Sequence, residues 1–315
     1  MHFLITGGYG YIGLRLCKEL LKKGFKVTAL AHKDLAAESL LAFNMKEFQT
    51  LKCDVTQQRD VIHIFEQLDR PIDCVFHLAG QKYRKYLSSE VYFQNNFIGT
   101  LNMLECCRIF NVKKFIFSSS ISVYGHHVNF PLLAEDPPFR QFEPKYLPVD
   151  EKHDVKPYPN DFYAISKYFS EQLCKFYYDT SGVTSIVLRI SRVYGPGLNT
   201  GPIFNATKKA LSNEPITASD DISTDFVFID DVIKANVASA LQKINQFEIY
   251  NIASGEESTL YDICSKIVKL VYSSSQVKLC TKPKARFSLD ISKAKRDLYY
   301  QPTRVEKGLT ECIEN

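Results

Sequence analysis

The sequence of 315 residues has no tryptophan and few methionines, glycines and prolines: 3 Met, 14 Gly and 13 Pro. So little glycine and proline excludes a collagen-like or low-complexity chain. No apolar run approaches the about 18 residues of a membrane-spanning helix, so we expect no membrane contact. The 39 basic and 35 acidic residues give a net charge of +4, and the basic residues occur in short pairs and not in one block. A nucleic-acid-binding surface usually needs a denser basic stripe, so no nucleic acid is expected as a partner.

Metal-binding and disulfide motifs are also absent. The nine cysteines include one adjacent pair and no CxxC spacing, which supports neither a zinc site nor a disulfide framework. Cys74 lies in an apolar run, as a small buried hydrophobic residue would. The chain enters a glycine-rich loop within its first eight residues, so we expect no signal peptide and a cytoplasmic protein.

Short apolar runs alternate with helical patterns over the first 190 residues. The predicted strands are Phe3–Ile5, Lys26–Ala31, Glu47–Leu51, Cys74–Leu78, Lys114–Ser118 and Ser185–Arg189. The predicted helices are Ile12–Lys23, Asp60–Leu68, Glu90–Phe110 and Asp161–Thr180. This alternation predicts an α/β fold with a Rossmann-type, doubly wound parallel sheet. Ligands of such sheets bind at the carboxyl ends of the strands.

Changes of pattern suggest two domains. Residues 1–190, with about 222–246, are expected to form a dinucleotide-binding domain, and about 191–221 with 247–315 a small C-terminal lobe for the substrate. Residues 126–147 are aperiodic and read as an inserted loop, either a lid or an inert surface excursion.

Three motifs carry the chemistry. Gly7, Gly10 and Gly13 lie between the first strand and helix, where glycines admit a tight turn and a pyrophosphate at the helix N-terminus. Tyr163 and Lys167 are four residues apart and share a helix face. A neighbouring cation favours the phenolate and so a general base, although such a pair is often only a surface pair. Ser118–Gly125 places hydroxyls after a central strand, or forms only a polar turn.

In this order, the motifs resemble the extended short-chain dehydrogenase/reductases, and within them the NAD-dependent epimerase/dehydratase family. The resemblance implies a catalytic triad in which Tyr163 is the general base, Ser120 hydrogen-bonds the same substrate oxygen and Lys167 holds the nicotinamide ribose. The implied cofactor-binding residues are Gly7, Gly10, Tyr11, Ile12, Gly13, His32, Lys33, Asp54, Val55, Leu78, Ala79, Gly80, Lys82, Asn96, Ser118, Tyr163 and Lys167.

Departures from the family pattern bear on the cofactor and the substrate. An acid is expected after the second strand in NAD-specific members, but this chain has His32 and Lys33 there. A basic pair can receive a 2′-phosphate, so we expect NADP in preference to NAD. The implied substrate-binding residues are Lys82, Ser120, Ser122, Tyr163, Arg192 and Arg286, and no metal is implied.

The resemblance implies an NAD(P)-dependent nucleotide-sugar epimerase that transfers hydride at C4. Ile121 and Ser122 stand where 4,6-dehydratases of the family carry an acidic pair, which disfavours dehydration. An NADPH-dependent reductase of nucleotide 4-keto-sugars uses the same triad and stays an alternative, as does a non-catalytic dinucleotide sensor or scaffold. The family commonly dimerises through two long helices, so we expect a homodimer.

Overall fold

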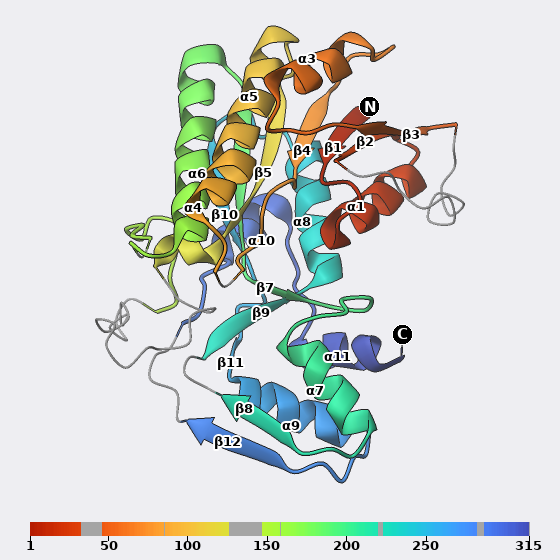
Figure 1. The fold of residues 1–315 in the computed structure, drawn as a ribbon, viewed down its shortest axis with the longest axis vertical. Helices are drawn as coiled ribbons and strands as arrows, with labels where there is room; N and C mark the ends of the chain where they lie inside the picture. The colour runs from red at the N-terminus through yellow and green to blue at the C-terminus, as the bar shows by residue number, and fades with distance from the viewer. Residues whose placement is uncertain are drawn as a thin grey trace. The chain divides into compact units, whose positions relative to one another are not determined.

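A seven-stranded sheet forms the centre of the first of two units in the computed structural model (Figure 1). The structure describes residues 1–32, 46–84, 86–125, 147–157, 159–219, 223–281 and 287–314. The strands stand in the order β3-β2-β1-β4-β5-β6-β10. Their bounds are β1 His2–Thr6, β2 Lys26–Ala31, β3 Phe48–Lys52, β4 Cys74–His77, β5 Lys114–Ser120, β6 Thr184–Ile190 and β10 Glu248–Ile252.

Both faces of this sheet are covered by helices, which is why its strands are apolar without alternation. The pairs β1·β2, β1·β4, β2·β3 and β4·β5 are parallel. Leu4, Val75 and Phe115 belong to one core cluster with side chains of α3, α5 and α6. Phe3 points to the other face, where its ring lies 5.2 Å from the ring of Phe25, between α1 and β2. The helices of this unit are α1 Tyr11–Lys22, α3 Gln58–Glu66, α4 Ser89–Tyr92, the π-helix η1 Phe93–Ile98, α5 Gly99–Ile109, the 3₁₀-helix η2 Ile121–Tyr124 and α6 Phe162–Ser181.

The second unit holds two small sheets. β11-β9-β7 form one, with β7 parallel and β11 antiparallel to β9, and β8 pairs with β12 in parallel. The strands are β7 Arg192–Tyr194, β8 Ile216–Ser219, β9 Thr224–Phe228, β11 Glu257–Ser258 and β12 Val277–Thr281. The helices are α7 Pro202–Leu211, α9 Leu260–Leu270, α10 Ser292–Leu298 and α11 Val305–Glu314, while α8 Ile229–Leu241 begins in this unit and ends in the first.

The chain passes between the two units several times. The first unit comprises Met1–Tyr124, Val155–Arg189 and Ile233–Tyr250, and the second Gly125–Asp154, Ile190–Val232 and Asn251–Asn315. These ranges differ from the expected domains in both directions. Residues 125, 147–154, 190 and 223–232 are expected in the dinucleotide-binding domain but lie in the second unit, and residues 247–250 are expected in the C-terminal lobe but lie in the first unit. Within the expected inserted loop, residues 126–146 lie outside the described residues.

The predicted fold class is confirmed, and one helix differs from the prediction. The expected helix Glu90–Phe110 is divided into α4, η1 and α5, with a π-helical turn at Phe93–Ile98. A π-turn carries an extra residue, which the apolar spacing of the sequence does not reveal. The carbonyl oxygen of Asn96 in this turn accepts bonds from the hydroxyls of Thr100 at 2.5 Å and Ser170 at 3.0 Å. None of the helices in the described part of the chain is long and apolar enough to cross a membrane.

Candidate functional site

The turn between β1 and α1 brings the chain close to its own backbone. Gly7 has a φ of +65°, a conformation that glycine adopts without strain. A Cβ atom on Gly7 would lie 2.9 Å from the nitrogen of Ala79, and a Cβ on Gly8 would lie 2.7 Å from the Cβ of Ala29. On Gly10, the N-cap of α1, a Cβ would meet only the carbonyl oxygen of Gly7, at 3.2 Å. The loop is therefore packed on its sheet side and accessible at Gly10.

A cavity of about 930 Å³ lies over this loop at the carboxyl ends of β1, β2, β3 and β4. Eight of the expected cofactor residues line it: Gly7, Gly10, His32, Asp54, Val55, Leu78, Ala79 and Gly80. The sequence analysis missed nine others, namely Tyr9, Leu30, Ala31, Cys53, Thr56, Gln57, Gln81, Gln94 and Asn95. Most of them are immediate neighbours of the expected residues at the strand ends, so strand topology could have identified them.

The other expected cofactor residues lie elsewhere. Tyr11, Ile12 and Gly13 form the first turn of α1, and Lys82 is exposed. Lys33 lies outside the described residues. Asn96, Ser118, Tyr163 and Lys167 do not line the cavity and form a separate polar cluster in the same unit.

That cluster joins the end of β5 to the first turns of α6. Tyr163 accepts a hydrogen bond from the Ser120 hydroxyl, which itself lies 2.8 Å from the Ser122 hydroxyl. The ammonium group of Lys167 donates to the carbonyl oxygen of Ser118 at 2.7 Å and lies 4.9 Å from the centre of the Phe117 ring. The structure therefore brings the expected triad of Ser120, Tyr163 and Lys167 to one place.

The electrostatics of the triad differ from the expectation that Lys167 lowers the pKa of Tyr163. Burial raises the pKa of Tyr163 to about 12, and the hydrogen bond from Ser120 opposes this shift. Burial also lowers the pKa of Lys167 to about 8. Removal from water disfavours the charged form of each group, and the Lys167 ammonium is directed at a carbonyl oxygen. Sequence spacing shows the shared helix face but not the desolvation.

Asn96 holds the loop after β4 against α6. Its side-chain oxygen accepts from the backbone N–H of Gln81 at 2.6 Å, and its amide nitrogen donates to the Gln81 carbonyl at 3.1 Å and to the Ser166 hydroxyl at 2.9 Å. A Cβ atom on Gly80 would lie 2.8 Å from the Asn96 oxygen and 3.5 Å from the Lys167 nitrogen. Glycine at position 80 therefore leaves room for the Asn96 and Lys167 side chains.

A buried ion pair ties the same helix to the sheet. Glu171, one turn beyond Lys167, is 0% exposed and accepts two bonds from Arg189 of β6, at 2.7 and 3.1 Å. Its carboxylate also accepts from the hydroxyl of Ser119 at 2.5 Å, and Arg189 donates to the hydroxyl of Tyr124 at 2.9 Å. Ser119 lies between the two serines that contact Lys167 and Tyr163, so this network positions the end of β5 against α6.

The expected substrate residues are divided between the two units. Ser120, Ser122, Tyr163 and Lys82 belong to the first unit, and Arg192 to the second. Arg192 lies on β7 with its guanidinium group 5.8 Å from the centre of the Phe226 ring. Arg286 lies outside the described residues.

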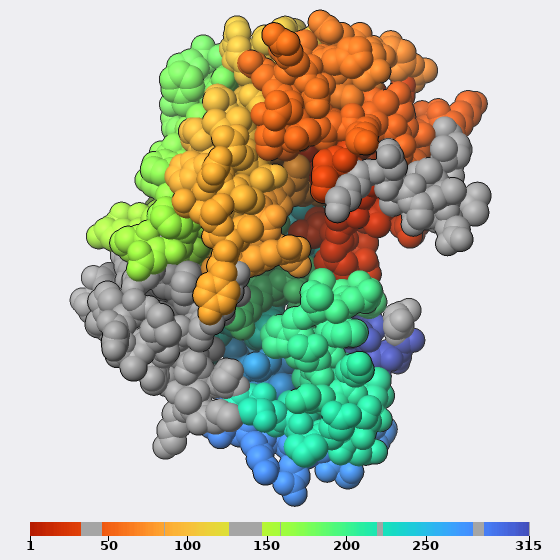
Figure 2. Space-filling model, in the orientation of Figure 1, coloured from red at the N-terminus to blue at the C-terminus, as the bar shows by residue number. Residues whose placement is uncertain are grey.

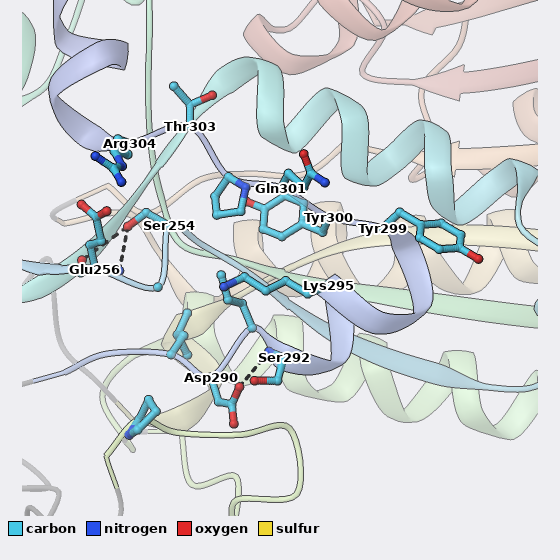
Figure 3. Close-up of a pocket in the computed structure, with 15 residues that line it drawn as sticks. Ser254, Glu256, Asp290, Ser292, Lys295, Tyr299, Tyr300, Gln301, Thr303 and Arg304 are labelled. Atoms are coloured by element: carbon cyan, nitrogen blue, oxygen red, sulfur yellow. Dashed lines mark hydrogen bonds between the residues drawn. The ribbon is translucent and has the colours of Figure 1, made fainter.

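The second unit has a cavity of its own, of about 700 Å³, shown in Figure 3. Its lining carries both charges, with the Lys295 side chain extending between Ser254 and Ser292 (Figure 3). None of the expected site residues that the structure describes lines this cavity. It is therefore not part of the site expected from the sequence.

Two observations indicate that the first unit can accommodate a dinucleotide. The cavity beside Gly10 has a size typical of cofactor sites, and the N-terminus of α1 there offers backbone N–H groups to a phosphate. Beside Lys167, the buried hydroxyl of Ser118 has no hydrogen-bond partner among the described residues. A buried hydroxyl without a partner is costly, and a polar group of a ligand would satisfy it.

Comparisons with known proteins agree with these features. Residues 3–253 match the NAD dependent epimerase/dehydratase family. The UDP-glucuronate 4-epimerase of Thermodesulfobacterium geofontis is 30% identical over 329 residues, with 99% of this chain and 95% of that protein covered. The UDP-glucuronic acid 4-epimerase of Bacillus cereus, in complex with UDP-glucuronic acid and NAD, is 28% identical with a TM-score of 0.79, over 100% of this chain and 98% of that one. The UDP-glucose 4-epimerase of Thermotoga maritima, with UDP-glucose, is 26% identical with a TM-score of 0.81 over the same shares.

Proposed function

Because this chain belongs to the NAD dependent epimerase/dehydratase family, we propose that it is a 4-epimerase of UDP-sugars. The observation that carries the proposal is the cluster of Ser120, Tyr163 and Lys167 at the end of β5 and the start of α6. The T. geofontis and B. cereus proteins named above support UDP-glucuronic acid as the first substrate to test, with UDP-glucose second.

In the proposed reaction, the chain's own residues move and hold a proton. The Tyr163 phenolate accepts the proton of the sugar 4-hydroxyl, and the Ser120 hydroxyl donates a hydrogen bond to that same oxygen. The resulting keto-sugar turns over, and Tyr163 returns the proton when the 4-hydroxyl forms again with the opposite configuration. A nicotinamide bound there would supply the acceptor and donor of the C4 hydride. Lys167 and the Ser118 hydroxyl would hold the nicotinamide riboside end, and the Gly10 turn the pyrophosphate.

Two alternative reactions have less support. 4,6-Dehydration needs acid–base groups beside the triad, and the positions that follow Ser120 hold Ile121 and Ser122, whose side chains carry no carboxylate. Reduction of a 4-keto-sugar uses the same triad with NADPH. The NADP preference expected from His32 and Lys33 finds no support in the B. cereus structure, which contains NAD. We therefore propose NAD as the cofactor, with the exposed His32 at the adenosine end of the cavity.

One experiment tests both the reaction and the cofactor. The purified protein is denatured and the released dinucleotide identified by mass spectrometry, and native protein is incubated with UDP-glucuronic acid or UDP-glucose, with and without added NAD. We expect NAD in the released fraction. We also expect conversion of one sugar to its C4 epimer, monitored by NMR of the sugar protons. Release of NADP, or net consumption of NADPH with a 4-keto-sugar, would instead favour the reductase. A protein inactive with every nucleotide sugar would contradict the enzyme assignment.

We also propose a homodimer formed through α5 and α6, which lie side by side at the surface (Figures 1 and 2). Ile109, Phe169 and Phe176 on these helices are 47%, 43% and 57% exposed. The ring of Phe169 lies 6.3 Å from both Phe93 and Phe97 of η1, which are partly exposed, so the three rings form one aromatic cluster at this surface. Apolar surface gathered in this way is typical of an interface between copies of a chain.

Light scattering at micromolar concentration is expected to give twice the 36.0 kDa of one chain. Phe169→Asp is expected to produce monomers, because a carboxylate would be buried at the contact. The matched control is Phe204→Asp on α7 of the second unit, where the phenylalanine is 38% exposed. A wild-type protein that elutes as a monomer would contradict the dimer.

A further inference from the structure

A buried carboxylate lies at the start of the helix that carries Tyr163 and Lys167. Asp161 is the N-cap of α6 and only 5% exposed. Its side-chain oxygen accepts from the backbone N–H of Ala164 at 3.0 Å, and its carbonyl oxygen accepts from the N–H of Ile165 at 2.9 Å. The carboxylate also accepts from the N–H of Tyr163 itself. Asp161 therefore fixes the first turn of α6, where the phenol is attached.

The groups around this carboxylate are mostly phenols. Burial is the main cause of the raised pKa of Tyr163 and of Tyr83, which lies in the segment after β4. The negative charge of Asp161 raises both pKa values further. Tyr92 of α4 packs edge-on against the Tyr163 ring at 6.2 Å, and its hydroxyl is bonded to the backbone of Arg84. Burial raises the pKa of Asp161 to about 6, although the two backbone N–H donors lower it in part. Near neutral pH the carboxylate is thus mostly ionised, but it takes up a proton under mildly acidic conditions.

We propose that Asp161 is a positioning residue for proton transfer at Tyr163. Its carboxylate fixes the first turn of α6, and its negative charge holds the proton on the Tyr163 phenol. This inference deepens the proposed function and rests on it, because it assumes that Tyr163 exchanges a proton with the substrate. A like charge near a phenol disfavours the phenolate. Asp161 thereby restrains Tyr163 as a base and supports it as the acid that returns the proton.

The sign of the effect follows from the two protonation states of Asp161. Above about pH 6 the ionised carboxylate raises the Tyr163 pKa, and below it the protonated carboxyl has no such effect. Asp161→Asn removes the charge and keeps an oxygen that can cap the helix. The rate profiles of the wild type and Asp161→Asn should therefore coincide below about pH 6. Above it the variant should have a higher kcat/KM, by up to about tenfold for a shift of about one pKa unit.

The kinetic test compares kcat/KM from pH 5 to pH 10 for the wild type and Asp161→Asn. Asp179→Asn, at the far exposed end of the same helix, carries the same change of charge and should leave the profile unchanged. Asp161→Ala removes cap and charge together and should lower kcat at every pH, while Asp161→Ser, which keeps a cap, should follow Asp161→Asn. Superimposable profiles for the wild type and Asp161→Asn would overturn the proposal.

A second readout needs neither substrate nor cofactor turnover. Protein labelled with ¹³C at the tyrosine ring carbon that bears the hydroxyl is titrated by NMR, and the Tyr163→Phe spectrum identifies the Tyr163 signal among the 18 tyrosines. We expect the Tyr163 titration to move to lower pH in Asp161→Asn, and an unchanged titration would contradict the proposal. An enzyme without epimerase activity that still shows this shift would reject the proposed function and leave the coupling of Asp161 to Tyr163 intact.

Discussion

Tyr163→Phe is expected to lower kcat by about 10³-fold while the protein keeps its fold and its dinucleotide. The variant lacks the phenolic oxygen that is bonded to Ser120 at the end of β5, and with it the group that would exchange a proton with the substrate. General acid–base catalysis contributes about 10²–10⁴-fold to a rate. The ring itself remains, so its packing against Tyr92 at 6.2 Å is retained.

The measurement is the single-turnover and steady-state rate of C4 epimerisation. Tyr178→Phe is the matched control, because Tyr178 lies near the end of the same helix, where the Lys175 nitrogen is 5.8 Å from the centre of its ring. It should retain wild-type kcat. If Tyr163→Phe stayed within about threefold of the wild type, Tyr163 would not be the base and the proposed mechanism would be wrong.

Removing the buried carboxylate of Glu171 should have the largest effect on stability. Glu171→Ala leaves the guanidinium group of Arg189, 3% exposed, without the two bonds that it donates to the carboxylate. An uncompensated buried charge costs about 3–5 kcal/mol. The Ser119 hydroxyl loses its acceptor at the same time, so the end of β5 is also released from α6.

Urea unfolding of the wild type and Glu171→Ala measures this loss. Asp179→Ala breaks the exposed pair with Lys175 on the same helix, with side chains 48% and 50% exposed, and should cost less than about 1 kcal/mol. The double variant Glu171→Gln/Arg189→Met removes both charges and should recover much of the stability. Equal losses for Glu171→Ala and Asp179→Ala would show that the buried pair does not stabilise the fold.

Strong local signals made the fold and most of the glycine-loop cavity predictable. The apolar strands, the helical spacing of α1 and the glycines at 7, 10 and 13 each follow from short-range backbone and packing rules. Gly182, with a φ of +68°, likewise ends α6 close to the predicted boundary. The strand topology then places the residues that follow β1, β2, β3 and β4 at one edge, which is why so many expected cofactor residues line one cavity.

The rest of the site depends on desolvation and hydrogen bonds between distant segments. The sequence shows that Tyr163 and Lys167 share a helix face, but not that burial raises the pKa of Tyr163 to about 12 or that Lys167 is bonded to Ser118. Asp161 gives no signal beyond that of an ordinary helix cap. The π-turn around Asn96 is stabilised by Thr100 and by Ser170 of another helix, and no spacing within one helix predicts such a contact.

The order in which the chain supplies its strands affects how the protein is made. The sheet of the first unit ends at β10, Glu248–Ile252, next to β6, although the first six strands are complete by Ile190. During synthesis β6 therefore remains an unpaired, apolar edge until some sixty further residues have left the ribosome. An exposed strand edge of this kind pairs readily with other chains. Nascent chains that stop between β6 and β10 therefore expose this edge, and no single cut of the chain yields either unit intact.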